Sequence, residues 1–161
     1  MPVSGLSVRN ANPPTFSRRL FSLGFGEIDD SYSFSSVDTA IDGTCIVVGN
    51  WLSETSFMLK LSLYKTVLQF KEYAYAGRLR SVAATKTGAV FMVGETIYYG
   101  EGGKDIYLLK TDSEGTLLNY ATFGTTGDDY GRSVKSTNDG GCIVIGSKNW
   151  LIKTDENGNV E

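Results

Sequence analysis

The chain has 161 residues and a formal net charge of −3, so it can form one domain with a sizeable core and has no basic excess that would suit nucleic acid. It contains no histidine, which removes the commonest general base and the commonest transition-metal ligand. Nineteen glycines against three prolines, with many aromatic and β-branched residues, are typical of an all-β chain rich in turns. No apolar run is long enough to span a membrane, so we expect neither nucleic acid nor a membrane as partner.

The N-terminal segment, residues 1–17, is rich in Ser, Asn and Pro, and we expect it to be flexible. It lacks the basic start and the apolar stretch of a signal peptide, which favours the cytoplasm unless a leader has been removed. Residues 18–26 (RRLFSLGFG) then alternate apolar residues with small or polar ones, and this alternation predicts a strand.

A repeat of about 45 to 50 residues follows, a period typical of repeat architectures. A Ser-Val dipeptide occurs three times, and each serine is followed by a glycine after seven residues and by another after thirteen. The dipeptides are Ser36-Val37, Ser81-Val82 and Ser133-Val134, and the glycines are Gly43 and Gly49, Gly88 and Gly94, Gly140 and Gly146. Short apolar runs lie between the two glycines, which predicts strands that are buried on both faces. The second glycine of each copy is expected to meet a positive φ or close packing.

Each copy predicts an antiparallel meander of four strands. The apolar strand is followed by a strand that ends in lysine (Lys60, Lys110 or Lys153), then by a polar turn and a last strand. The copies span about residues 31–75, 78–124 and 130–161, and the third stops before its last strand. A single meander cannot bury both of its faces, whereas stacked copies bury each other.

The repeat resembles a bacterial and archaeal β-propeller repeat of the form DGGYIVVG…YLIKTDSNGNV. The best match is SVKSTNDGGCIVIGSKNWLIKTDENGNVE at residues 133–161, and the likeness covers roughly residues 18–161. It implies an all-β fold of four-stranded propeller blades, three in this chain, and implies little about function. A β-trefoil is the alternative, because it too has three repeats of similar length.

Closure of a propeller needs more than three blades, since propellers typically have four to eight. The strand that the third copy lacks has a counterpart at the other end of the chain, because residues 18–26 resemble LLNYATFG of the second copy. We therefore expect residues 18–26 to complete the last blade of a second copy, giving a six-bladed homodimer.

Candidate ligand-binding residues lie on the face formed by the loops that precede the first strand and follow the second strand of each copy. The second copy carries an insertion there, residues 95–105, and loops that grow on a rigid scaffold often carry function. The candidates are Tyr98, Tyr99, Glu101 and Lys104 in this insertion, with Trp51 and Trp150 in similar places of the other copies. The aromatic residues are interpreted first as packing between blades, and a stacking platform for a sugar or a partner loop is the other interpretation.

Two acidic pairs, Asp29-Asp30 and Asp128-Asp129, precede the first strand of the first and third copies. They are interpreted as turn residues that start these strands, with a calcium site as the alternative. TDENGN spaces Asp155, Asn157 and Asn159 as calcium loops do, but its glycine position differs, and Asn157-Gly158 suits a hairpin turn. No other cofactor is expected.

The favoured function is a non-catalytic module that binds protein or carbohydrate through the face with the 95–105 loop. A purely structural, self-assembling unit is one alternative, and a lyase or hydrolase that works in the propeller channel is another. Cys45 and Cys142 are expected to be buried free thiols, because equivalent positions of different blades lie too far apart for a disulfide.

Overall fold

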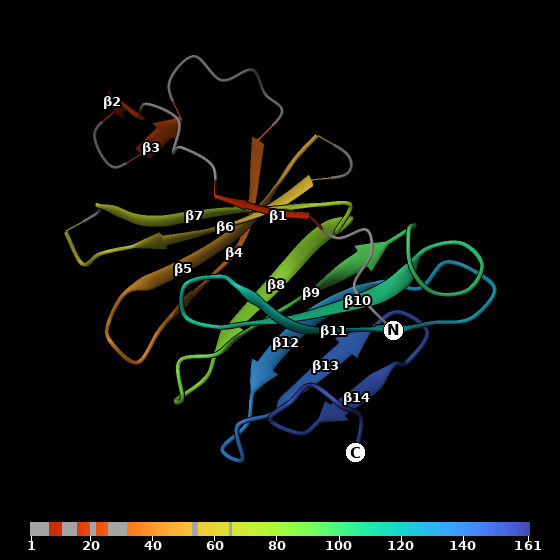
Figure 1. Cartoon of the computed structure of the whole chain (residues 1–161). Helices are drawn as coiled ribbons and strands as arrows, with labels where there is room; N and C mark the ends of the chain where they lie inside the picture. Colours follow the sequence, from red (N-terminus) through yellow and green to blue (C-terminus); the bar gives the residue numbers. More distant parts are fainter. Residues whose placement is uncertain (1–6, 11–15, 20–21, 26–31, 53–54, 65) are drawn as a thin grey trace.

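A computed structural model describes residues 7–10, 16–19, 22–25, 32–52, 55–64 and 66–161 (Figure 1). Every regular element among them is a β-strand, which confirms the all-β prediction. No helix in this part of the chain is long and apolar enough to cross a membrane. The strands form three antiparallel sheets that stack face to face, together with a two-stranded hairpin.

The three sheets coincide with the three copies of the repeat, and each is a meander in which strands adjacent in sequence pair with each other. Sheet 1 contains β4 (Tyr32–Thr39), β5 (Cys45–Trp51), β6 (Thr55–Leu61) and β7 (Val67–Ala74). Sheet 2 contains β8 (Arg78–Ala84), β9 (Val90–Thr96), β10 (Asp105–Thr111) and β11 (Leu117–Phe123). Sheet 3 contains β12 (Gly131–Ser136), β13 (Cys142–Gly146) and β14 (Leu151–Thr154). The closed six-bladed ring remains a prediction.

The core lies in the two interfaces between these sheets. Strand β9 contributes to both, because its side chains alternate: Val90 and Met92 pack toward sheet 1, whereas Phe91 and Val93 pack toward sheet 3. Every residue of β9 is buried, as the apolar sequence predicted. Full burial of one such side chain contributes about 1.5–3 kcal/mol, so stacking is what makes each thin sheet stable.

Both cysteines are free thiols, and they differ in burial because they face different surroundings. Cys142 packs into the core cluster between sheets 2 and 3 and is fully buried. Cys45 occupies the equivalent position of sheet 1, on the side away from sheet 2, and is only half-buried. The expectation that both are buried therefore holds for Cys142 alone.

The N-terminal strands differ from two expectations. Within the segment expected to be flexible, Ser7–Asn10 forms β1, which pairs with β7 as a fifth strand of sheet 1. Residues 18–26 do not form one strand, because β2 (Phe16–Arg19) ends before β3 (Ser22–Phe25) begins, and these two pair with each other. The physical reason is the same in both cases: backbone N–H and C=O groups at a strand edge gain by pairing with any strand within reach. Pairing of residues 18–26 with β14 of a second copy remains a prediction.

The second glycine of each repeat is required by close packing and not by a positive φ. A Cβ atom on Gly94 would overlap the carbonyl oxygen of Arg78, and one on Gly49 would overlap that of Ser33. By contrast, the first glycine of the repeat, such as Gly88 with a φ of +89°, turns the chain between the first two strands. Because glycine has no Cβ atom, the second strand of each sheet can lie close to the first strand at the point where their pairing register shifts.

Replacing Gly94 by Ala should therefore destabilise the protein more than replacing Gly88. We expect a loss of about 2–3 kcal/mol for Gly94→Ala from overpacking, and about 1–2 kcal/mol for Gly88→Ala from backbone strain alone. Urea unfolding followed by circular dichroism measures both losses. Gly127→Ala is the control, because its Cβ would approach only the flexible end of Lys148. Equal losses at Gly94 and Gly127 would contradict the close-packing account.

Candidate functional site

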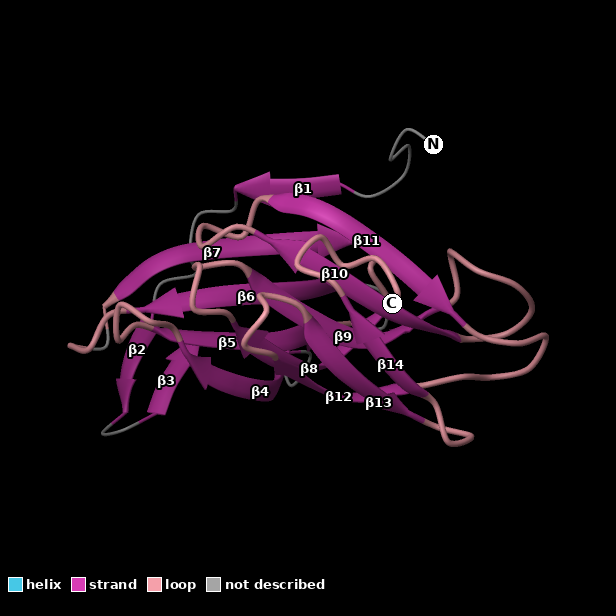
Figure 2. Ribbon diagram, turned by 90° about the horizontal axis from the view of Figure 1, so that it is seen from below, coloured by secondary structure: helices cyan, strands magenta, loops and turns pink. Residues whose placement is uncertain are grey.

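A pocket of about 360 Å³ opens where the first strands of the three sheets, β4, β8 and β12, lie side by side. Figure 2 shows these strands along one side of the stack. The lining is almost wholly polar and consists of Ser33, Ser35, Asn50, Arg78, Leu79, Arg80 and Arg132. We call it the inner-strand pocket. It lies at the end of the strands that carries the 95–105 loop, which is the face predicted to bind a ligand.

A β-bulge in each first strand brings three of these residues to the pocket. The pairing register shifts between Phe34 and Ser36 in β4, between Leu79 and Ser81 in β8, and between Gly131 and Ser133 in β12. At each shift one residue of the first strand has no partner in the pairing register with the second strand. These residues are Ser35, Arg80 and Arg132, and all three line the pocket. Bulges redirect a side chain and are common beside functional sites. The same β-bulge, present in all three sheets, therefore directs one side chain from each sheet into the pocket.

Arg80 is held in a fixed orientation by a buried carboxylate. Its Nε donates to Glu95 Oε2 at 2.5 Å and its Nη2 donates to Oε1 at 2.7 Å. Glu95 is only 2% exposed, and its hydrogen bonds to Arg80 raise the pKa of the guanidinium. Such a bidentate pair fixes geometry as well as charge. The guanidinium carbon also lies 5.8 Å from the centroid of the Tyr130 ring.

The other two arginines of the pocket carry charges that the described part of the chain does not neutralise. Arg78 and Arg132 are both exposed, and neither forms an ion pair or side-chain hydrogen bond within the described residues. Within the described residues, Glu95 is the one carboxylate that an ion pair or hydrogen bond joins to any of the three pocket arginines. The described lining therefore carries more positive than negative charge, in a chain whose net charge is negative.

Asn50 forms the buried base of the pocket and joins sheet 1 to sheet 2. Its Nδ2 donates to Ser35 Oγ at 2.9 Å and to the Leu79 carbonyl at 3.0 Å, while its Oδ1 accepts the Leu79 N–H at 2.7 Å. Both amide hydrogens are thus used within the protein, so Asn50 positions the pocket walls. Ser35 uses only an acceptor site in this contact, which leaves its hydroxyl hydrogen free to donate.

The predicted ligand-binding residues of the 95–105 loop do not line this pocket. Tyr99 packs inward, with its ring centroid 5.6 Å from that of Tyr107 and 5.5 Å from that of Tyr120, and so makes the packing contacts that were its first interpretation. Tyr98 lies at the surface and contacts Tyr75 edge-on at 5.4 Å. Glu101 is exposed. Glu95, at the start of this segment, does not line the pocket but binds the lining residue Arg80.

The remaining candidates also make structural contacts. Lys104 donates its backbone N–H to Asp128 Oδ1 at 3.0 Å, and its Nζ lies 5.3 Å from the Tyr130 ring centroid. Trp51 stacks on Tyr32 in sheet 1 at 5.3 Å. Trp150 packs against the core between sheets 2 and 3. The two tryptophans and the loop residues are therefore not gathered into one site.

Asp129 is fully buried and surrounded by donors. It accepts the Thr125 N–H and hydroxyl at 2.8 Å each and the Trp150 Nε1–H at 3.0 Å, and Lys148 Nζ lies 3.3 Å away. Burial alone would raise its pKa, but these donors lower the pKa to about 2. Asp128 likewise accepts the Tyr130 hydroxyl at 3.0 Å, and Asp29 and Asp30 lie outside the described residues. These contacts are those of turn residues, and no group of three or more His, Cys, Asp or Glu in the described part could hold a metal ion.

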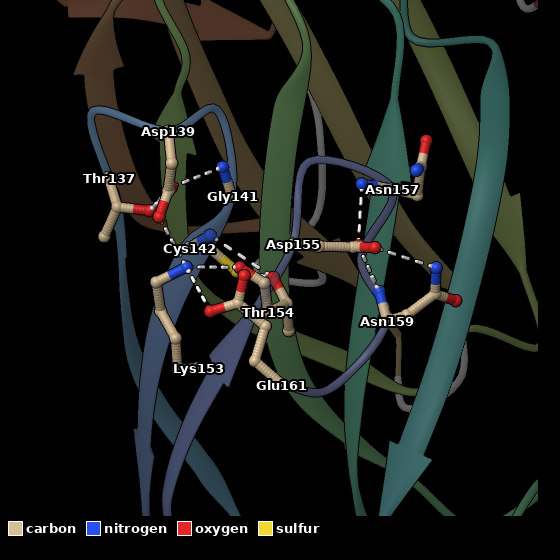
Figure 3. A network of polar contacts seen from close by, with 10 residues as sticks. All are labelled: Thr137, Asp139, Gly141, Cys142, Lys153, Thr154, Asp155, Asn157, Asn159 and Glu161. Carbon is tan, nitrogen blue, oxygen red and sulfur yellow. Dashed lines mark hydrogen bonds and ion pairs between the residues drawn. The ribbon is translucent and has the colours of Figure 1, made fainter.

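The opposite end of sheet 3 shows what the calcium-like TDENGN spacing builds. Asp155 accepts the backbone N–H groups of Asn157 and Asn159, both at 2.8 Å, which makes an Asx-type turn (Figure 3). Lys153 beside it donates to Asp139 at 2.8 Å and to Glu161 at 3.0 Å. The Lys153 hydrogen bond holds the pKa of Asp139 well below its usual range. Asp155 therefore closes the turn after β14, and Lys153 connects β14 to the turn between β12 and β13.

The pocket residues carried a sequence signal that the repeat analysis did not use. Each bulge residue directly precedes the repeated Ser-Val dipeptide, in SSV, RSV and RSV. Because equivalent positions of stacked repeats point to the same place, a basic residue in two of three copies at one position could have indicated a shared site.

No protein-family model matches this chain, and no curated protein matches its sequence. Among solved structures, it is similar to a protein of unknown function from Bacteroides caccae, with a TM-score of 0.56 and 12% sequence identity. The match covers 83% of this chain and 46% of the Bacteroides protein, so the chain spans about half the length of this neighbour. At this identity the likeness shows a shared fold alone.

The buried Asp129 predicts a specific dependence of stability on pH. A carboxyl whose pKa falls from 3.8 to about 2 on folding stabilises the protein above its unfolded pKa, and this stabilisation disappears as the pH falls toward 2. We expect Asp129→Asn to lower the urea midpoint at pH 7 and to flatten its decline between pH 5 and pH 2.5. Asp128→Asn, at the exposed neighbouring residue, should have a smaller effect on the urea midpoint at pH 7 and on its decline with falling pH. An unchanged pH profile in Asp129→Asn would contradict this assignment.

Proposed function

We propose that the chain is a non-catalytic ligand-binding module whose site is the inner-strand pocket. The observation that carries this proposal is the convergence of three bulge residues, Ser35, Arg80 and Arg132, from three successive sheets. Packing does not require a bulge at the same point of each sheet to present polar side chains to one cavity. A rigid scaffold that presents such groups is typical of a binding site.

The chemistry of the pocket favours binding over catalysis. A hydrolase or lyase needs a group that can accept or donate a proton near the substrate. Among the described residues, Glu95 is the carboxylate that binds a pocket arginine, and both of its oxygens accept hydrogen bonds from Arg80. The guanidinium groups stay protonated at any physiological pH and cannot act as bases.

The size and lining of the pocket favour a small hydrophilic ligand over a protein partner. Small-molecule sites commonly have volumes of about 300–1,000 Å³, and this pocket has about 360 Å³. Protein interfaces usually depend on buried aromatic anchors, whereas Leu79 is the only apolar residue among the described ones that line the pocket. Of the two ligand classes expected from the sequence, carbohydrate therefore fits better. If the sheets are propeller blades, the pocket lies at the mouth of the central channel.

Filling the pocket should abolish binding. Ser33 lines the pocket and forms no side-chain hydrogen bond to a described residue, so Ser33→Phe should occupy the cavity and leave the fold intact. We expect the wild type to bind members of an array of neutral and acidic oligosaccharides, and Ser33→Phe to lose at least about tenfold in affinity, or 1.4 kcal/mol. Thr39→Phe, at the exposed far end of β4, is the matched control and should bind normally. An array without any bound glycan, or equal binding by Ser33→Phe, would contradict the proposed function.

Self-assembly is a second candidate function, and the exposed face of sheet 3 favours it. Ile143, Ile145 and Leu151 are 39%, 48% and 72% exposed there. Their equivalents in sheet 2, Phe91, Val93 and Leu108, are buried against sheet 3. A serine ladder also stops at this face: Ser36 Oγ accepts the Val82 N–H at 3.4 Å, Ser81 Oγ accepts the Val134 N–H at 3.2 Å, and Ser133 is the next member. We propose that a further sheet from a second copy covers this face.

Solution mass by light scattering tests the second candidate. The wild type should have the mass of two chains, and Ile145→Lys combined with Leu151→Lys should have the mass of one, because charges would be buried in the interface. Ile41→Lys combined with Leu63→Lys, at exposed positions of the turns in sheet 1, is the control and should leave the mass unchanged. A wild type with the mass of one chain would rule out this assembly.

A further inference from the structure

We propose that the ligand of the inner-strand pocket is a sugar acid, whose carboxylate binds to Arg78 and Arg132. This inference rests on the proposed function, because it names the chemical class that the same pocket takes. The shared chemistry is a carboxylate on a hydroxylated ring. It can come from a free uronic acid or from a uronic-acid residue of an oligosaccharide.

The charge of the pocket selects an anion. Three guanidinium groups line it, and Glu95 neutralises only Arg80. The other described acids that form ion pairs have lysine partners: Asp129 with Lys148, Asp42 and Glu114 with Lys60, and Asp139 and Glu161 with Lys153. A ligand carboxylate could therefore reach Arg78 and Arg132 without displacing a partner from the described part of the chain.

The guanidinium geometry favours a carboxylate in particular. Arginine presents N–H donors in a planar fork that matches the two oxygens of a carboxylate. Arg80 provides an internal example, since its Nε and Nη2 already bind both oxygens of Glu95. Two of its five N–H donors are used in that pair, so Arg80 retains donors for a ligand while its position stays fixed.

The other lining groups suit hydroxyls. The Ser35 hydroxyl accepts from Asn50 and can still donate, and the Ser33 hydroxyl forms no hydrogen bond within the described residues. A ligand that offers only a carboxylate would leave these groups without partners other than water. A purely apolar acid would find little surface to contact, because Leu79 is the one apolar side chain in the described lining. Hydroxyl groups beside a carboxylate satisfy both requirements.

Isothermal titration calorimetry with matched sugars tests the ligand class. The probes are galacturonate and trigalacturonate, each compared with its neutral counterpart, galactose and a galactose trimer. We expect the acids to bind, the neutral sugars not to bind, and the affinity for the acids to fall as NaCl is raised from 50 to 500 mM. Binding of galacturonate itself identifies a free acid as sufficient, whereas binding of the trimer alone identifies an oligosaccharide.

Two variants test the residues. Arg78→Gln and Arg132→Gln should each weaken acid binding by about tenfold or more, since each removes a charge-assisted hydrogen bond. Both should fold normally, because neither arginine forms an ion pair within the described residues. Lys135→Gln makes the same change of charge on β12 and should leave binding unchanged.

The outcomes separate this inference from the proposed function. Equal binding of neutral and acidic sugars, unchanged binding by both arginine variants, or no binding of either acid would overturn the sugar-acid inference. In each of these cases the proposed function would still stand if Ser33→Phe abolishes binding of another array member. It would fall as well if the array showed no bound glycan, or if Ser33→Phe had no effect on the binding of any ligand.

Discussion

The structure depends on the fact that a four-stranded meander cannot bury both of its faces by itself. Sheet 2 solves this by packing between sheets 1 and 3, so that every residue of β9 is buried. The same stacking places β4, β8 and β12 side by side. The inner-strand pocket lies at that junction, so it exists only because apolar burial brings three separate sheets together. The burial of apolar side chains that drives folding thus also determines where the pocket lies.

A single repeated irregularity converts this scaffold into a site. The bulge in each first strand lies opposite the close approach that the second glycine permits, as at Arg78 and Gly94. All three copies keep this backbone device, but they differ in the residue it presents, which is serine in sheet 1 and arginine in sheets 2 and 3. The packing is therefore conserved between the copies, while the chemistry of the pocket varies with one side chain per sheet.

The sequence predicted the features that depend on local pattern and missed those that depend on distant partners. Apolar runs between repeated glycines were sufficient to place strands such as β5, β9 and β13. Ser7–Asn10 has no strand pattern, and it pairs because the edge of β7 is available. Tyr99 looked like a ligand platform because its partners, Tyr107 and Tyr120, come from other strands. The bulges gave no signal in composition, so the arginines could be recognised only by comparing the copies position by position.

Glu95 shows what a ligand carboxylate would do in this pocket. The chain itself supplies one buried carboxylate, which fixes Arg80 through two short hydrogen bonds. Full internal neutralisation would have been simple in an acidic chain, since only one more carboxylate near each of Arg78 and Arg132 is needed. Leaving two guanidinium groups exposed beside one that is fixed keeps fork-shaped donors available at a rigid position. These fixed donors are the physical basis for the proposal that an anionic ligand binds there.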